Sequence, residues 1–124
     1  MINARGETVA SKPSLRAACK RRHCLIPADG FYEWSGPKGA RQPHWFHPRD
    51  GGLLLFAGLY ESWQRDADER ETTFTIITTE ANVLMEPIHD RMPVILDDDA
   101  ADEWMFEETG VERLHALLGP PLDD

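Results

Sequence analysis

The segment IHDRMP, residues 88–93, places three charged or titratable side chains next to one another. They are His89, Asp90 and Arg91, and they stand between an apolar residue and a proline. Such groups are costly to bury without partners, and histidine changes charge near neutral pH, so this cluster is typical of sites that move protons. A lone histidine is more often structural. Its two charged neighbours make a functional role about as well supported as a structural one.

A second titratable side chain, Glu33, stands in the aromatic run FYEW at residues 31–34. Strand alternation places Phe31 and Glu33 on one face and Tyr32 and Trp34 on the other. A carboxylate beside Phe31 is either near a sheet edge or partly buried with a raised pKa, the condition for general acid or base chemistry. Taken alone, the edge position is the commoner case. Trp34 has two possible roles as well, stacking on a nucleic-acid base or packing in the core.

Metal and cofactor chemistry are not expected from this sequence. The potential ligands Cys19, His23, Cys24, His44 and His47 occur in one region, but their spacing does not match a zinc finger. Cys24 opens an apolar strand and is expected to pack as a small hydrophobic residue, not to act as a nucleophile. The sequence also has no glycine loop for phosphates and no nucleophile elbow.

Length and composition indicate one domain with its own core. The chain has 124 residues, of which 41% are hydrophobic, including four Trp and five Phe. No apolar run approaches the roughly 20 residues of a membrane helix. Arg5 and Glu7 stand where a signal peptide would be apolar. These features predict a cytoplasmic protein with no membrane partner and two free thiols.

The net charge of −9 argues at first against a nucleic-acid partner. The charge is unevenly distributed, however. Residues 1–49 hold nine Lys and Arg against three acidic residues, a net of +6, whereas residues 50–124 hold four against 19, a net of −15. The first half therefore has the charge to face a polyanion. The basic run at 20–22 is better explained as a solvated helix end.

The turn residues and short connections between the apolar segments predict an α+β fold: a mostly antiparallel β-sheet or partial barrel with flanking short helices. Strands are expected at 24–26, 31–34, 44–47, 53–63, 72–78 and 93–96. Helices are expected at 11–19, 79–84, 99–108 and 109–118, with Asp99 as one N-cap and a capping box at Thr109 and Glu112. Gly58, inside the longest strand, suggests a bulge or a close backbone approach.

Five blocks of this sequence, in this order, closely resemble the SRAP family, the SOS-response-associated peptidase or abasic-site processing proteins. The blocks are INARGET at 2–8, RHCLIPADGFYEW at 22–34, FAGLYE at 56–61, TIITT at 75–79 with Asn82, and IHDRMPVIL at 88–96. The resemblance extends from Ile2 to about Glu108, and such a multi-block match is very unlikely to arise by chance.

The resemblance implies a function in the response to DNA damage. Family members bind single-stranded DNA containing abasic sites and form a thiazolidine between the ring-opened sugar and an N-terminal cysteine. The family's asparagine, glutamate and histidine fall on Asn3, Glu33 and His89, which implies catalytic roles for these residues. Arg5 and Arg91 fall where family members hold DNA phosphates. The resemblance also implies a monomer without cofactors, at the nucleoid if the host is bacterial.

The chain departs from the family pattern at its start. Family members begin with Met-Cys-Gly-Arg, whereas this chain begins at the block containing Asn3. Neither Cys19 nor Cys24 carries a free α-amine, so we expect residues 1–124 to form a single partial SRAP domain that is inactive in crosslinking as it stands. Two alternatives remain: a non-catalytic remnant that binds single-stranded DNA, and a hydrolase of another kind built on Glu33 and His89.

Overall fold

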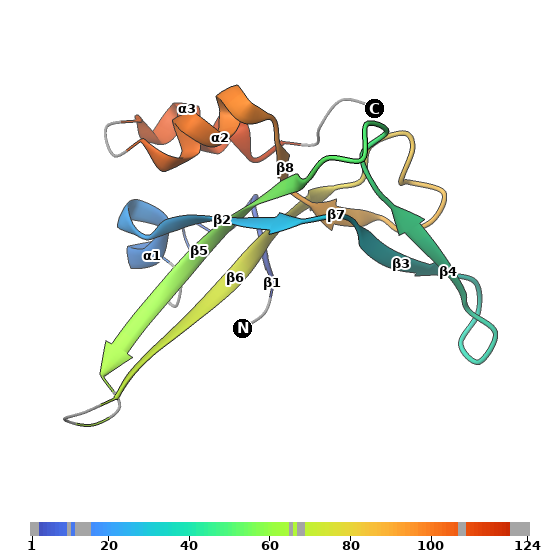
Figure 1. The fold of residues 1–124 in the computed structure, drawn as a ribbon, viewed down its shortest axis with the longest axis horizontal. Helices are drawn as coiled ribbons and strands as arrows, with labels where there is room; N and C mark the ends of the chain where they lie inside the picture. Colours follow the sequence, from blue (N-terminus) through green and yellow to red (C-terminus); the bar gives the residue numbers. More distant parts are fainter. Residues whose placement is uncertain are drawn as a thin grey trace.

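A computed structural model describes residues 3–9, 11, 16–64, 66, 69–106 and 109–119. It contains both helices and strands, which confirms the predicted α+β class (Figure 1). The elements, in chain order, are β1 (Asn3–Arg5), α1 (Arg16–Arg21), β2 (His23–Ala28), β3 (Phe31–Ser35), β4 (Gln42–Phe46), β5 (Leu54–Gln64), β6 (Arg70–Glu80), β7 (Arg91–Pro93), β8 (Ile95–Leu96), α2 (Asp98–Met105) and α3 (Val111–Leu117).

Two long strands, β5 and β6, form the centre of a curled six-stranded sheet. The strand order is β1-β6-β5-β2, with β7 paired to β6 and β8 paired to β5. All of these pairs are antiparallel except β1 with β6, which is parallel. The hairpin β3–β4 forms a separate two-stranded sheet and projects to one side, away from α1 and the far end of β5–β6 (Figure 1). The sheet thus confirms the mostly antiparallel prediction, and only β1 departs from it.

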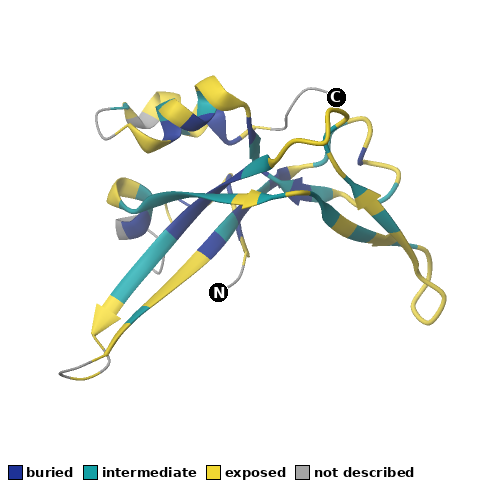
Figure 2. Ribbon diagram, in the orientation of Figure 1, coloured by how far each residue is buried: buried dark blue, intermediate teal, exposed yellow. Residues whose placement is uncertain are grey.

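One face of the sheet carries the core. Buried residues alternate along β6 at Thr75, Ile77 and Thr79, as expected for a strand with one covered face (Figure 2). Helix α2 covers this face with Trp104, which is 1% exposed and donates its Nε1–H to the carbonyl of Cys24 at 3.0 Å. An indole buried with its polar hydrogen paired anchors the helix to β2.

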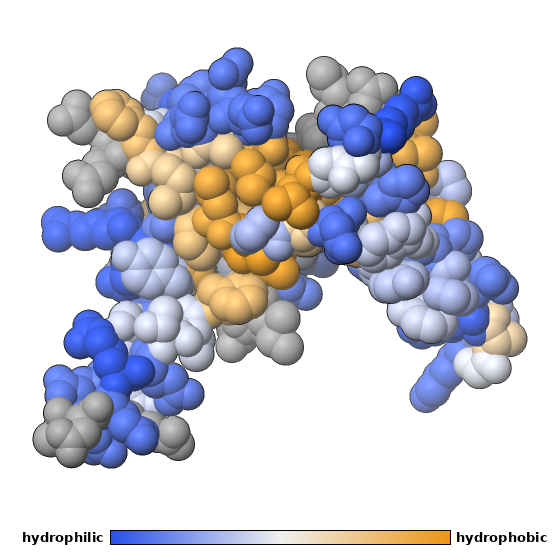
Figure 3. All heavy atoms as spheres, viewed as in Figure 1, coloured by the Kyte–Doolittle hydropathy of each residue, from blue (hydrophilic) through white to orange (hydrophobic). Residues whose placement is uncertain are grey.

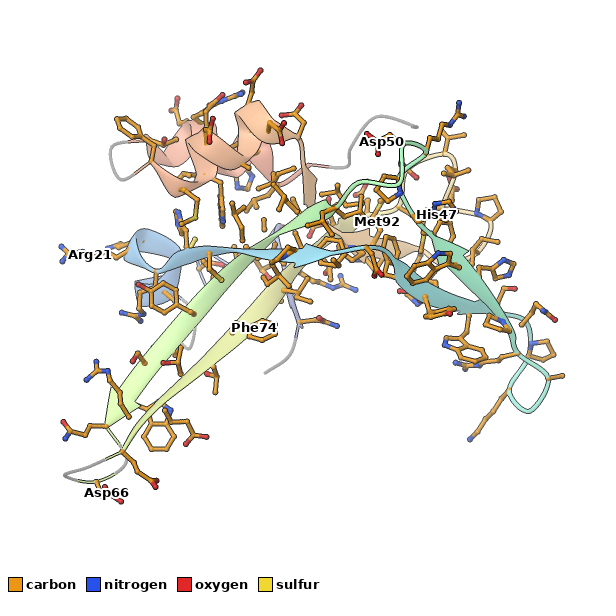
Figure 4. The ribbon with its side chains drawn as sticks, in the orientation of Figure 1. Arg21, His47, Asp50, Asp66, Phe74 and Met92 are labelled. Atoms are coloured by element: carbon orange, nitrogen blue, oxygen red, sulfur yellow. The ribbon has the colours of Figure 1, made fainter. Side chains whose placement is uncertain are left out.

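The opposite face of the sheet is less covered. Apolar side chains gather over the middle of the sheet in the view of Figure 3, whereas hydrophilic side chains occupy the far ends of the two hairpins. Phe74 projects from β6 on this side and is exposed (Figure 4). None of the helices in the described ranges is long and apolar enough to cross a membrane.

Gly58 marks a close approach and not a bulge. The β2–β5 register runs through Gly58 without interruption and pairs it with Cys24, and the β5–β6 register begins at its pair with Ile76. A Cβ at this position would lie 2.2 Å from Ile26 Cδ1 and 3.0 Å from Cys24 Sγ. Only glycine therefore lets the β2 side chains pack directly on the β5 backbone.

The helix expected at 79–84 is wrong. Strand β6 continues to Glu80, because Thr79 pairs with Met92 of β7 and its β-branched side chain suits a strand. Residues 83–88 form turns instead. Their start is fixed by the Asn82 side chain, whose Oδ1 accepts the amide hydrogen of Met85 at 3.0 Å.

Two predicted helix caps are also wrong. The N-cap of α2 is Asp97, whose carboxylate accepts from the Ala100 amide at 2.8 Å, so the helix begins earlier than Asp99 would allow. The N-cap of α3 is Gly110, without a side-chain bond, and the Thr109 hydroxyl instead donates to the Glu103 carbonyl at 2.7 Å. Of the helix expected at 11–19, residues 12–15 lie outside the described residues, and α1 continues to Arg21.

Candidate functional site

The structure brings Glu33 and His89 together from segments 56 residues apart in the sequence. Glu33 points from the middle of β3, and His89 stands in the connection just before β7. Glu33 Oε2 and His89 Nε2 are 4.0 Å apart, and the two side chains are 26% and 42% exposed. A carboxylate and an imidazole at this separation and exposure can reach the same bound molecule and exchange protons with it.

The other ring nitrogen of His89 faces its own chain. Nδ1 accepts the amide hydrogen of Arg91 at 3.1 Å and also lies 3.1 Å from the Arg91 carbonyl oxygen. The carboxylate of Asp90 is 3.5 Å away. The ring is thus held by Asp90 and Arg91, at the start of β7, with its Nε2 edge turned toward Glu33.

The guanidinium of Arg91 binds the carboxylate of Glu7 through two parallel bonds, Nη1 to Oε2 at 2.6 Å and Nη2 to Oε1 at 2.9 Å. Its Nη2 also donates to the carbonyl and the hydroxyl of Thr78, both at 3.0 Å. The hydrogen bonds from Arg91 lower the pKa of Glu7 to about 2, and those to Glu7 raise the pKa of Arg91. Sequence reasoning missed Glu7, because opposite charges 84 residues apart carry no signal of contact.

Asn3 and Arg5 occupy the exposed side of β1, with buried Ala4 between them. The parallel register pairs Arg5 with Thr78, whose hydroxyl accepts from Arg91, so the two arginines lie on the same face of the sheet. Within the described part of the chain, no hydrogen bond or ion pair joins Asn3 or Arg5 to the Glu33–His89 pair.

Trp34 lies on the outer face of the β3–β4 hairpin, opposite Glu33, and is 51% exposed. Tyr32 on the same strand face and Trp45, its partner across the hairpin, are exposed as well. The rings of Tyr32 and Trp45 have centroids 4.8 Å apart. Trp34 is therefore not a core residue in this structure, and the exposed rings form an aromatic surface, defined here as Tyr32, Trp34 and Trp45.

A cavity of about 490 Å³ opens between this hairpin and the segment that precedes β7. Phe31, which shares a strand face with Glu33, lines it together with Phe46 and Met85. His47, Asp50 and Met92 also lie at this cavity (Figure 4). The arrangement gives an apolar recess with polar groups at its margin, on the side of the hairpin that carries Glu33.

The histidines considered as metal ligands have other partners. The ring of His23 stacks on Trp104 at 4.1 Å and lies 2.9 and 2.6 Å from the carbonyls of Trp104 and Cys19. His44 is paired with the Ser35 hydroxyl at 2.7 Å. Burial raises the pKa of both Cys19 and Cys24, which disfavours thiolate chemistry. No three Cys, His, Asp or Glu within the described ranges are grouped as a metal ion would require.

Two named relatives share most of this chain. Abasic site processing protein YoqW of Bacillus subtilis strain 168 is 47% identical over 123 residues, which cover 97% of this chain and 54% of YoqW. Abasic site processing protein HMCES of Gallus gallus is 34% identical over 140 residues, covering 95% of this chain and 42% of HMCES. The chain thus spans about half the length of the curated relatives it matches.

Solved structures share the fold as well. A protein from Bacteroides thetaiotaomicron superposes with a TM-score of 0.88 at 32% identity, covering 95% of this chain and 53% of that one. A protein from Bordetella bronchiseptica gives a TM-score of 0.83 at 33% identity, covering 98% and 61%. The family model for SOS response associated peptidase (SRAP) matches residues 1–124. The chain therefore belongs to the SRAP family.

Proposed function

We propose that this chain is part of an abasic-site processing protein that acts on abasic sites in single-stranded DNA. The observation that carries the proposal is the meeting of Glu33 with His89 at 4.0 Å, in a family whose named relatives process abasic sites. We propose further that residues 1–124 form one partial SRAP domain that works as a monomer in the cytoplasm, at the DNA.

The proposed chemistry is proton transfer around an aldehyde. Glu33 donates a proton to the ring oxygen as the abasic sugar opens, and His89 moves protons during addition to the aldehyde carbon. In the complete reaction an α-amine adds to that carbon and water leaves to give an imine. A neighbouring thiol then closes the thiazolidine ring, so two bonds form at one carbon. Asn3 orients the amine or the sugar through its amide group.

The remaining proposed roles concern the DNA strand. Arg5 is exposed and free to approach phosphate oxygens. Arg91 has five N–H hydrogens, and its Nη1 uses one of its two on Glu7, which leaves the other for a phosphate. Bases stack on Trp34 within the aromatic surface. Lys38 and Arg41, in the connection between β3 and β4, add positive charge to the same hairpin.

The experiment that tests this function is incubation with a labelled single-stranded oligonucleotide containing one abasic site, followed by denaturing electrophoresis. Two proteins are compared: the chain as printed, and a version extended upstream to carry the family's N-terminal cysteine. We expect a shifted band with the extended version only. The same version with that cysteine changed to Ala, and an oligonucleotide without the abasic site, serve as controls. No shifted band with the extended version would contradict the proposal.

Non-covalent binding of single-stranded DNA is a second candidate, favoured by the exposed aromatic surface and the basic residues near it. It predicts binding that weakens as salt rises and leaves no covalent product. The absence of binding at low salt would exclude it.

A hydrolase built on Glu33 and His89 would instead show a hydrolytic activity that the Glu33→Gln variant loses.

A further inference from the structure

Two hydrogen-bonding arrangements compete at Nδ1 of His89. The Arg91 amide, which always carries its hydrogen, points at Nδ1 from 3.1 Å and requires a lone pair there. The Arg91 carbonyl at 3.1 Å and the Asp90 carboxylate at 3.5 Å are acceptors and favour a hydrogen on Nδ1 instead. A hydrogen on Nδ1 would face the amide hydrogen directly. The position of the Arg91 peptide therefore decides which tautomer the neutral ring adopts.

Arg91 is held by its backbone and by its side chain. The peptide group that joins Asp90 to Arg91 accepts the amide hydrogen of Ala81 at 3.0 Å through the Asp90 carbonyl, and Arg91 pairs with Glu80 of β6. The Arg91 side chain is 15% exposed and is bonded to Glu7 and Thr78. The Thr78 carbonyl also accepts the amide hydrogen of Gly6 at 2.8 Å, so one carbonyl joins the end of β1 to Arg91.

We propose that Glu7 is a positioning residue for His89. By binding Arg91 it adds a side-chain anchor to the backbone bond from Ala81, orients the amide hydrogen that bonds to Nδ1, and so favours the neutral ring tautomer with its hydrogen on Nε2. That hydrogen faces Glu33 across 4.0 Å. The significance of this tautomer for catalysis rests on the proposed function, since it makes His89 a proton donor on the side where Glu33 and the sugar would meet. The tautomer itself does not rest on that function.

The test is a nitrogen-15 NMR measurement of the His89 ring in the full chain, at a pH where the imidazole is neutral. In the unmodified protein, the shifts are expected to identify Nε2 as the protonated nitrogen. Neither Glu7→Ala nor Arg91→Lys can form the two-bond pair. In both variants we expect the ratio of the Nε2–H tautomer to the Nδ1–H tautomer to fall about fivefold, the change expected for loss of one hydrogen bond. Glu7→Gln keeps the side-chain shape and replaces Glu7→Ala if that variant does not fold.

The matched control is Glu80→Gln. Glu80 pairs with Arg91 across β6–β7 and raises the pKa of Arg91 through its charge alone. Removing the Glu80 charge therefore tests the effect of losing a negative charge near Arg91. We expect the His89 tautomer to be unchanged in this variant. An Nδ1–H ring in the unmodified protein, or an unchanged ratio in Arg91→Lys and both Glu7 variants, would overturn the inference. Because the measurement uses no DNA, failure of the crosslinking experiment leaves its result intact.

Discussion

Glu7 and Arg91 are joined by two hydrogen bonds of 2.6 and 2.9 Å, which connect the turn after β1 to the segment that holds His89. The pair brings together two of the sequence blocks by which the family is recognised. A planar guanidinium bound at both oxygens of a carboxylate fixes orientation as well as distance. The pair therefore fixes how the segment that carries His89 lies against the residues that follow β1.

The same pair predicts a pH-dependent contribution to stability. The pKa of Glu7 falls from 4.5 to about 2 on folding, because Arg91 hydrogen bonds favour the charged form. A depressed pKa in the folded state means that the stabilisation is full above about pH 4.5 and is lost as the pH falls toward 2. Glu7 is 46% exposed, so solvent screening limits the contribution to about 1 kcal/mol.

We expect Glu7→Gln to lower the free energy of unfolding by about 1 kcal/mol near pH 7 and the deficit to shrink below pH 4.5. Urea unfolding of both proteins over a series of pH values measures this difference. A deficit that stays constant down to pH 2 would show that Glu7 acts through packing and not through its charge.

A second prediction concerns Gly58. The Gly58→Ala variant should lose about 1–3 kcal/mol in the free energy of unfolding, because the added Cβ would lie 2.2 Å from Ile26 Cδ1. The double variant Gly58→Ala with Ile26→Val removes that methyl group and should recover part of the loss. Thermal or urea unfolding of the unmodified protein, the two single variants and the double variant gives the coupling free energy between positions 58 and 26. If the two single losses in the free energy of unfolding simply add in the double variant, the direct contact is contradicted.

A third prediction separates the aromatic surface from other exposed tryptophans. Trp34→Ala should weaken binding of single-stranded DNA by about 1–3 kcal/mol if bases stack on this ring. Trp63→Ala is the matched control, since Trp63 is 47% exposed at the far end of β5. Fluorescence anisotropy with a labelled oligonucleotide at low salt measures both. Equal losses, or none, would remove the stacking role of Trp34.

The sequence was sufficient for features that depend on local pattern. Alternation along FYEW correctly placed Glu33 and Trp34 on opposite faces of the strand, and β-branched residues at 72–78 correctly indicated a strand. It failed where distant segments decide the outcome. Thr79 is extended because Met92 pairs with it, and the parallel pairing of β1 with β6 brings Glu7 to Arg91. No local propensity encodes either contact.

The catalytic and DNA-binding roles come from the family resemblance and not from local pattern. For a glutamate in an aromatic strand the structural explanation was the commoner one, and for the histidine beside two charged residues the two explanations had comparable weight. Their separation of 4.0 Å now supports a shared role, although 55 residues of intervening chain hid this proximity in the sequence. Those roles stay predictions until variants are measured.

We propose that Glu33 and His89 act together in proton transfer at an abasic site. The most direct measurement is the rate of covalent trapping on abasic single-stranded DNA by the upstream-extended protein and its Glu33→Gln variant. Glu61→Gln serves as a control, because Glu61 is engaged by Arg22 away from the site. We predict a rate about 100-fold or more lower for Glu33→Gln, the usual contribution of a general acid or base, and an unchanged rate for the control. Equal rates for Glu33→Gln and the unmodified protein would contradict the account.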